Sequence, residues 1–244
     1  MKENRYDDAV FFEKYSQVNR SRQGLSGAGE WGAFKKLLPD FAGKRVLDLG
    51  CGYGWHCKYA AEQGAARVSG VDLSRRMIVE AKRRNPAPQI EYRVCGIEDY
   101  DYPEGRWNCV VSNLALHYIA DLDAVFARVY QTLKPGGVFL FNIEHPCFTA
   151  GVHQEWICDS SGNALYRAID DYFLSGERRT NFLGCEVRKQ HHTLTQILMG
   201  LLKQGFELQA VEEAQPSKEM LQIPGMSDEL RRPMMLLVKA KRAE

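Results

Sequence analysis

The sequence predicts a doubly wound α/β fold, with a seven-stranded, mostly parallel sheet, helices on both faces and an insertion after the fifth strand. Three observations carry this prediction. Short apolar runs alternate with helical segments through residues 45–143, as in βαβ units. A glycine-rich turn joins the first run to the helix that follows it. The alternation stops after residue 144, resumes with a helix near residue 193 and ends with two further apolar runs.

The individual elements follow from periodicity and from Gly, Pro and capping residues. Ser74 is expected to cap the helix that begins after it. The Gly- and Ser-rich stretch 21–29 predicts a loop, and residues 135–137 predict a turn. Helices are expected at residues 8–18, 30–38, 55–63, 74–84, 121–133 and 193–203, and strands at 45–49, 67–71, 90–94, 110–111, 138–143, 206–211 and 234–240.

Composition disfavours several classes of partner. The 244 residues carry 32 basic and 31 acidic side chains, a net charge of +1, so no overall field favours nucleic acid or an anionic membrane. No apolar run approaches the ~18 residues of a membrane span, and the charged N-terminus does not resemble a secretory signal. The seven cysteines include no CxxC pair, which predicts reduced thiols, no zinc site and a cytoplasmic location.

The glycine turn predicts where a ligand binds. Gly50, Gly52 and Gly54 allow close approach to the backbone, but Trp55 follows where a dinucleotide-binding turn continues towards a third, later glycine. Asp72 comes 18 residues after Gly54, at the end of the second strand, where an acid accepts both hydroxyls of a ribose; the alternative is a charge that stabilises a helix N-terminus. Together they indicate a nucleoside without a recognised pyrophosphate.

The positions of five candidate residues also place the binding site at one edge of the sheet. Gly50, Asp72, Glu98, Asn113 and Glu144 each lie at or just past the end of a successive predicted strand. Parallel strands bring their carboxyl ends to one edge, and ligands of open α/β sheets bind there. The sequence therefore predicts a single site at that edge.

Three motifs resemble the class I methyltransferases that use S-adenosylmethionine. Residues 46–54, Val-Leu-Asp-Leu-Gly-Cys-Gly-Tyr-Gly, are similar to the first motif of that family, residues 71–74 to its second, and residues 133–137 to the turn that precedes its fifth strand. The resemblance covers about residues 40–145 and implies a Rossmann-like fold. The flanks, residues 6–20 and 191–194, resemble a bacterial small-molecule subgroup less specifically.

The resemblance implies roles for individual residues in binding S-adenosylmethionine and its product S-adenosylhomocysteine. Gly96 stands where the family often has Asp, so recognition of the adenine amino group would pass to Glu98, Asp99 or the backbone. The implied cofactor residues are Asp48, Gly50, Cys51 and Gly52 for the methionine part, Asp72 for the ribose, Leu73, Met77, Ile97 and Glu98 for the adenine, and Asn113 and Leu114 for the sulfonium region.

The acceptor side is predicted from histidines and aromatic residues. His145 and His117 follow the fifth and fourth strands and are candidate catalytic bases; for His145 the alternative is a loop histidine that caps a turn. Tyr15, Tyr118 and His191 are expected to contact the substrate, although His191 is also placed to cap a helix. The insertion aromatics Trp156, Tyr166, Tyr172 and Phe173 are expected to line an acceptor pocket or to form a core of their own.

These expectations define a domain plan and a function. Residues 1–40 would form an N-terminal helical lid, 41–143 the cofactor-binding core, 144–190 an insertion that forms the acceptor pocket or a lid, and 191–244 the completion of the core. The predicted reaction transfers a methyl group to oxygen or nitrogen of a small molecule, in a monomer or homodimer. The alternatives are a dinucleotide oxidoreductase, which Trp55 disfavours, a non-catalytic module that binds S-adenosylmethionine, and methylation of RNA or protein.

Overall fold

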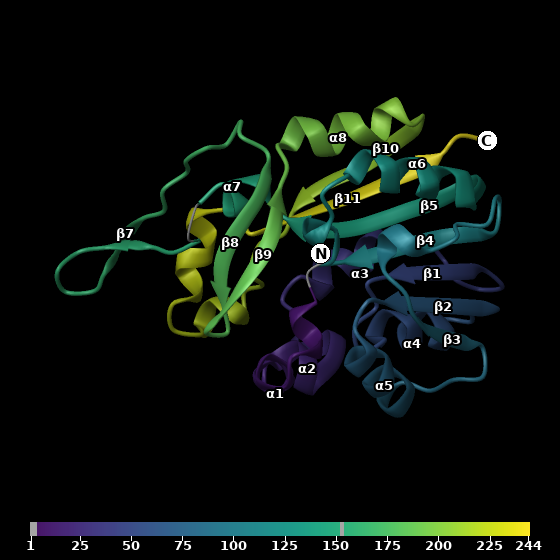
Figure 1. The fold of residues 1–244 in the computed structure, drawn as a ribbon, viewed down its shortest axis with the longest axis horizontal. Coiled ribbons are helices and arrows are strands. Elements are labelled where there is room, and N and C mark those ends of the chain that lie inside the picture. Colours follow the sequence, from purple (N-terminus) through teal and green to yellow (C-terminus); the bar gives the residue numbers. More distant parts are fainter. Residues whose placement is uncertain (1–3, 152–153) are drawn as a thin grey trace.

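The computed structural model describes residues 4–151 and 154–244 and is built on a seven-stranded sheet of order β10-β11-β5-β4-β1-β2-β3 (Figure 1). Every pair from β5 to β3 is parallel, and β11 runs antiparallel to both of its neighbours. The predicted fold class is confirmed. The strands are β1 Arg45–Leu49, β2 Arg67–Asp72, β3 Ile90–Val94, β4 Trp107–Asn113, β5 Leu133–Glu144, β10 Phe206–Glu213 and β11 Met235–Arg242.

Helices cover both faces of the sheet because the strand residues alternate between two cores. On one face, α3 (Trp31–Leu37), α4 (Trp55–Glu62) and α5 (Arg75–Arg84) pack on a cluster that includes Val46 and Val68. On the other face, α6 (Leu122–Thr132) and α8 (Leu194–Lys203) pack on Leu47, Leu49 and Phe141. The predicted helices are confirmed to within a few residues, and Ser74 caps α5 by accepting from the Met77 amide.

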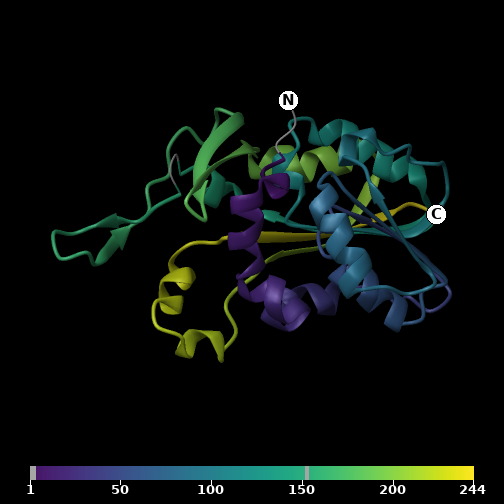
Figure 2. The same cartoon turned by 60° about the horizontal axis from the view of Figure 1, so that its bottom comes forward.

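The N-terminal segment lies at the end of the sheet where the parallel strands terminate. It comprises η1 (Arg5–Asp7), α1 (Ala9–Ser16), α2 (Asn19–Gln23) and η2 (Gly24–Gly27), and Figure 2 shows it beside the core. The predicted helix 8–18 is confirmed as α1, whereas the predicted loop 21–29 is wrong in part because it contains the end of α2 and all of η2. Residues 30–38 form α3, which packs in the core through Phe34.

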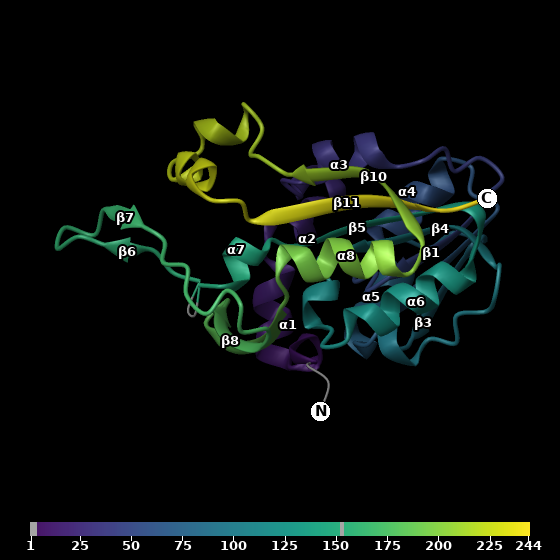
Figure 3. The ribbon, with the colours of Figure 1, turned by 90° about the horizontal axis from the view of Figure 1, so that it is seen from above.

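The insertion contains a short helix and two hairpins. Helix α7 (Pro146–Thr149) follows β5, and the hairpin of β6 (Ile157–Cys158) and β7 (Ala164–Tyr166) extends away from the body (Figure 3). The second hairpin, β8 (Gly176–Phe182) with β9 (Cys185–His191), returns to the sheet edge. Residues 214–234 lie between β10 and β11 and contain η5 (Met220–Gln222) and η6 (Met226–Arg231).

The predicted turn at 135–137 does not separate two elements, because β5 already begins at Leu133. The pairing of β4 with β5 shifts between Trp107 and Cys109, whose partners are Leu133 and Val138, so the intervening residues bulge out of the ladder. Gly136 adopts φ +71° there. Gly136 therefore lies in a bulge inside the strand and does not end it.

Among the helices of the described ranges, none has the length and apolar character needed to cross a bilayer.

Candidate active site

A cavity of about 370 Å³ opens at the carboxyl ends of the parallel strands. All five residues predicted to share this edge line it: Gly50, Asp72, Glu98, Asn113 and Glu144. The N-terminal segment, β8, β9 and the start of β11 close the remaining sides. The volume lies within the range of pockets that enclose small ligands. The sheet edge predicted from strand ends is thus one wall of a single cavity.

The glycine loop leaves bare backbone along one part of this cavity. Gly50 and Gly52 have φ values of +76° and +52°, a region that side-chain-bearing residues rarely adopt. A Cβ on Gly50 would lie 2.3 Å from the Cβ of Ala115, whereas a Cβ on Gly52 would meet no atom within 4 Å. The space beside Gly52 is therefore open for a ligand that contacts the main chain.

Asp72 joins this loop to the second strand. Its Oδ2 accepts from the Gly52 amide at 2.9 Å and its Oδ1 from the Ser74 amide at 2.8 Å. Burial raises the pKa of Asp72 to about 6, although these two hydrogen bonds favour the carboxylate. Each carboxylate oxygen retains further capacity to accept, so a vicinal diol at the cavity wall has a suitable partner.

The neighbouring wall is largely apolar. Leu73 and Met77, which come from the start of α5 and the turn before it, face the cavity together with Ile97 of η3 (Ile97–Asp99). Glu98 and Gly96 line the same side. A flat, apolar group of a ligand would be sandwiched here, with an acidic side chain and the main chain of Gly96 at its edge.

A chain of hydrogen bonds links the centre of the sheet to the N-terminal segment. Asn142 donates to Asn113 Oδ1 at 2.9 Å, and Asn113 donates to Glu30 Oε1 at 2.9 Å. Glu30 is 3% exposed and forms an ion pair with Arg20 at 2.9 Å. Asn113 and Arg20 both line the cavity, so the network fixes two of its walls relative to each other. Leu114, next to Asn113, has a left-handed φ of +54°.

Tyrosines line the far part of the cavity. The hydroxyls of Tyr6 and Tyr118 lie 3.1 Å apart, and the ring of Tyr15 meets that of Tyr6 edge to face at 5.1 Å. Tyr118 belongs to η4 (Leu116–Tyr118), which follows β4. The predicted substrate residues Tyr15 and Tyr118 are therefore both at the cavity, brought together by the N-terminal segment.

A buried ion pair lies beside these tyrosines. Lys189 donates to Glu144 Oε1 at 2.5 Å, and both residues line the cavity with His117. Burial opposes ionisation of Glu144, but the electrostatic interactions with His117 and Lys189, and the hydrogen bond from Lys189, keep the pKa of this carboxyl below its ordinary value.

His117 itself is 3% exposed, and neither ring nitrogen is hydrogen-bonded to a residue that the structure describes. Burial lowers the pKa of His117 to about 4, although the charge of Glu144 acts in the opposite direction. The imidazole is therefore neutral at physiological pH. A buried ring nitrogen without a partner costs about 1–3 kcal/mol, which a ligand at this wall would recover.

Four predicted site residues lie outside the cavity lining. Asp48 is buried beneath the loop, where it accepts from Cys57 Sγ at 3.2 Å, and Cys51 is the buried residue between Gly50 and Gly52. His145 caps α7 by accepting from the Cys147 amide at 3.0 Å, and its Nε2 lies 2.9 Å from Glu213. His191 is fully buried between Thr149, at 2.7 Å, and the Tyr172 carbonyl, at 2.8 Å.

The aromatic residues predicted for the insertion form neither the acceptor pocket nor a separate core. Phe173 is 88% exposed and Tyr166 is 58% exposed. Tyr172 accepts from the Leu194 amide at 3.1 Å, and Trp156 contacts arginine side chains. Besides Glu144, the insertion residues that line the cavity are Phe182 and Lys189, which the sequence prediction missed. The pattern of buried Val187, Lys189 and His191 has the two-residue period of a strand and is the signal for Lys189.

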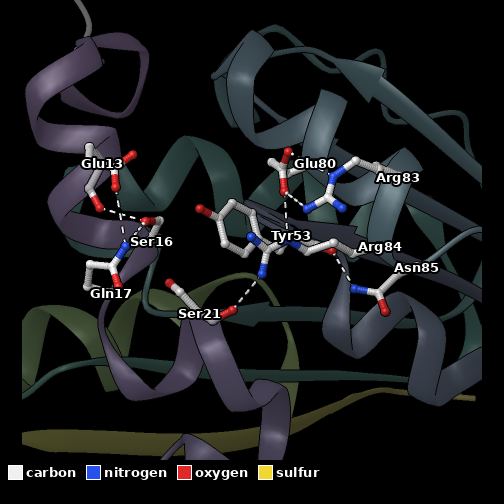
Figure 4. Close-up of polar contacts among 9 residues, drawn as sticks. All are labelled: Glu13, Ser16, Gln17, Ser21, Tyr53, Glu80, Arg83, Arg84 and Asn85. Carbon is white, nitrogen blue, oxygen red and sulfur yellow. Dashed lines mark hydrogen bonds and ion pairs between the residues drawn. The ribbon is translucent and has the colours of Figure 1, made fainter.

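Two sets of contacts with α5 hold the N-terminal segment over the cavity. Asp7 accepts from the Ser74 hydroxyl at 2.6 Å and from the Arg76 amide at 3.0 Å, at the start of α5. At the other end of α5, Arg84 donates to the Ser21 carbonyl at 2.8 Å and lies 4.6 Å from the Tyr53 ring centroid (Figure 4). One helix of the core thus anchors both ends of the segment.

The fold and the cavity define a doubly wound α/β protein with a nucleoside-type site at its sheet edge. Residues 47–141 match the family model described as a methyltransferase domain. A solved structure from Listeria monocytogenes, described as a putative S-adenosylmethionine-dependent methyltransferase, is 50% identical with a TM-score of 0.87, covering 91% of this chain and all of that one. One from Mesorhizobium loti is 40% identical with a TM-score of 0.83, covering 90% and 100%. The chain belongs to the S-adenosylmethionine-dependent methyltransferases.

Relatives with named substrates are more distant. A fatty-acid O-methyltransferase of Mycolicibacterium smegmatis is 31% identical over 67% of this chain and 64% of its own length. A malonyl-[acyl-carrier protein] O-methyltransferase of Serratia marcescens is 34% identical, but the match covers only 41% of this chain and 38% of that protein.

The residues at the cavity fit the cofactor of this family. The open side of Gly52 leaves room for an amino-acid tail against the main chain, the Asp72 carboxylate could accept from a sugar diol, and Met77 with Ile97 offer apolar surface to a base. In the described ranges, no group of His, Cys, Asp and Glu side chains is arranged to hold a metal ion.

Proposed function

We propose that this methyltransferase transfers the methyl group of S-adenosylmethionine to an oxygen or nitrogen of a small molecule bound beside His117 and Glu144. The observation that carries the proposal is the continuity of the cavity, which runs from the glycine loop and Asp72 to an imidazole without a hydrogen-bond partner. When bound, S-adenosylmethionine supplies an activated methyl group on a positively charged sulfur.

Binding of this cofactor is assigned to the residues already at the wall. The main chain of Gly50–Gly52 would contact the methionine part and Asp72 the ribose, while Asn113 and Leu114 would border the sulfur. Glu98, Leu73, Met77 and Ile97 would surround the adenine. The backbone of Cys51 belongs to the first group, and Asp48 would support the loop from below.

His117 would act on the acceptor. Its neutral imidazole accepts a proton from an acceptor hydroxyl or amine as the new bond to carbon forms, and the nearby Glu144 carboxylate stabilises the resulting imidazolium. Lys189 keeps Glu144 ionised and oriented. Tyr6, Tyr15 and Tyr118 would hold the acceptor in line and exclude water, which positions the reactants and raises their effective concentration.

Residues 4–27 are assigned as the lid, since Asp7 and Arg84 hold them across the cavity, and the β8–β9 hairpin of the insertion supplies the opposite wall. Two of the named relatives, the fatty-acid O-methyltransferase and the malonyl-[acyl-carrier protein] O-methyltransferase, favour transfer to oxygen.

The experiment is a substrate screen. The purified protein is incubated with S-adenosylmethionine and fractionated metabolite extracts, and S-adenosylhomocysteine is quantified by mass spectrometry. We expect one fraction to support turnover that His117→Gln removes. If every fraction fails although the protein binds S-adenosylhomocysteine, a non-catalytic binding module replaces the proposal.

A further inference from the structure

Three arginines gather outside the cavity, where the insertion meets residues 214–234. The guanidinium carbons of Arg167 and Arg232 lie 5.0 and 4.5 Å from the ring centroid of Phe148. That of Arg231 lies 4.7 Å from Trp156, which Arg167 and Arg232 also approach, at 5.6 and 5.8 Å. Two aromatic rings thus hold three positive charges close together.

Arg231 has a structural role. Its Nη1 donates to the Ala164 carbonyl and to Asp228, both at 3.0 Å, and its Nη2 donates to the Leu165 carbonyl. These bonds tie β7 to η6. The β6–β7 hairpin, which ends just before Arg167, is thereby fixed against residues 214–234, which include Arg232.

The other two arginines have buried N–H donors without acceptors. The Nη2 atom of Arg167 and the Nε and Nη1 atoms of Arg232 are buried without a hydrogen-bond partner. The Arg232 side chain is 9% exposed and has one ion pair, from Nη2 to Glu229 at 3.1 Å. Arg167 forms no ion pair with a described residue, although the charges of Glu229 and Glu155 favour its protonated form.

Like charge and burial make this arrangement costly without a ligand. Burial, together with the facing charge of Arg232, lowers the pKa of Arg167 to about 10. The aromatic rings contact the flat faces of the guanidinium groups, but the N–H donors point outward in the plane, so stacking leaves them unsatisfied. Each buried donor without an acceptor costs about 1–3 kcal/mol. A planar or tetrahedral oxyanion satisfies several of these donors at once.

We propose that Arg167 and Arg232 bind a carboxylate or phosphate group of the methyl acceptor. The Phe148 ring that contacts Arg232 also lies 5.8 Å from Nζ of Lys189, a residue of the cavity wall. One aromatic ring therefore separates the arginines from the acceptor end of the cavity. Arg167 is only partly buried, so part of its side chain is accessible to an anion from solvent.

The inference rests on the proposed methyl transfer and adds the class of acceptor. The acceptor is an elongated acid whose anionic group is remote from the atom that receives the methyl. Binding energy gained at such a distance orients the reacting end. Loss of either arginine therefore weakens acceptor binding and leaves cofactor binding intact.

The test uses inorganic phosphate and glutarate as probes of the full chain. Each is titrated at constant ionic strength, followed by calorimetry and by tryptophan fluorescence, because Trp156 lies within the cluster. We expect saturable binding of one anion that Arg167→Gln and Arg232→Gln each weaken at least 10-fold, as loss of a charge-assisted hydrogen bond does. The control is Arg179→Gln, whose side chain is 66% exposed on β8. It should bind as the parent does.

The outcomes separate the two proposals. Tighter binding of phosphate assigns a phosphate monoester, and tighter binding of glutarate assigns a carboxylate. Absence of saturable binding by both, or equal binding in the parent and both variants, overturns the site. S-adenosylhomocysteine is titrated into the same samples. Its failure to bind the parent counts against the proposed function, whereas loss of anion binding alone counts only against the arginine site.

Discussion

The Asp72 carboxylate accepts a hydrogen bond from the Gly52 amide at 2.9 Å, which ties the end of β2 to the loop that follows β1. A second bond from the Ser74 amide orients the same carboxylate towards the start of α5. One side chain therefore organises the three elements that border the proposed ribose position. Its replacement is expected to affect ligand binding more than folding.

For Asp72→Ala we expect S-adenosylhomocysteine affinity to fall at least 100-fold, because two hydrogen bonds to a charged group are lost at about 1.5–3 kcal/mol each. Calorimetric titration measures the affinity, and circular dichroism checks that the variant is folded. Asp101→Ala, which removes an exposed acid, is the control. Undiminished affinity in Asp72→Ala would remove this residue from the site.

The raised pKa of Asp72, about 6, gives a pH dependence of cofactor affinity. In the proposed site the ionised carboxylate would accept from both ribose hydroxyls, and a proton on it would block one acceptor position. S-adenosylhomocysteine should therefore bind more weakly as pH falls from 7 to 5. Titrations at half-unit intervals test this, and an affinity that is flat over the range contradicts it.

Buried Asp48 predicts a pH-dependent stability in the cofactor-free protein. Its pKa is raised to about 7, chiefly by burial, whereas the unfolded value is about 3.8. Because the folded state holds this proton more tightly, its stability falls as pH rises from about 4 to 7. Asp48→Asn removes the dependence, and we expect it to gain about 2–4 kcal/mol relative to the parent between pH 5 and 8. Urea unfolding measures the gain; parallel pH profiles would be inconsistent with a buried, protonated Asp48.

The two candidate bases can be separated by paired substitutions. We expect His117→Gln to lower kcat about 100-fold or more and to change S-adenosylhomocysteine affinity less than twofold, because the ring contacts the acceptor end alone. His145→Asn keeps a side-chain acceptor for the Cys147 amide and should retain turnover, since His145 lies outside the cavity lining. The reverse pattern would restore His145 as the base.

Asp7→Ala is expected to loosen the lid. It removes the acceptor for the Ser74 hydroxyl and the Arg76 amide, at a cost of about 1 kcal/mol, as for a lost helix cap. Hydrogen exchange in residues 4–27 should accelerate, while exchange in the central strands stays unchanged. The pKa of Asp7 is lowered, because these hydrogen bonds outweigh its partial burial. The contacts of Asp7 with α5 therefore persist above about pH 4 and weaken below it. Asp40→Ala serves as the control, and unaltered exchange would show that Asp7 does not hold the lid.

The sequence predicted the sheet well because local signals and burial agree there. The bounds of β1 and β3 match the prediction, and the edge residues of five successive strands converge on one cavity. Parallel topology brings strand ends together whatever the connecting segments do, so this part needed no tertiary information. The bulge at Gly136 shows the limit: turn residues predict a change of direction but not whether a strand continues past it.

The acceptor side was predicted less well, because it depends on how distant segments dock. Lys189 reaches Glu144 only through the β8–β9 hairpin, and Tyr6 reaches Tyr118 only through the docking of η1. His145 and His117 both follow strands, and the sequence does not distinguish a ring that caps a helix from one that faces a cavity. The arginine cluster joins residues 65 positions apart and had no local signal.

The hydrogen-bonded run from Asn142 through Asn113 and Glu30 to Arg20 makes the lid mechanically continuous with the middle of the sheet. If residues 4–27 act as the proposed lid, release of a nucleoside product would require one of these hydrogen bonds to break. Opening of this hydrogen-bonded chain would then limit the turnover rate. Higher solvent viscosity would lower kcat even where methyl transfer itself is fast.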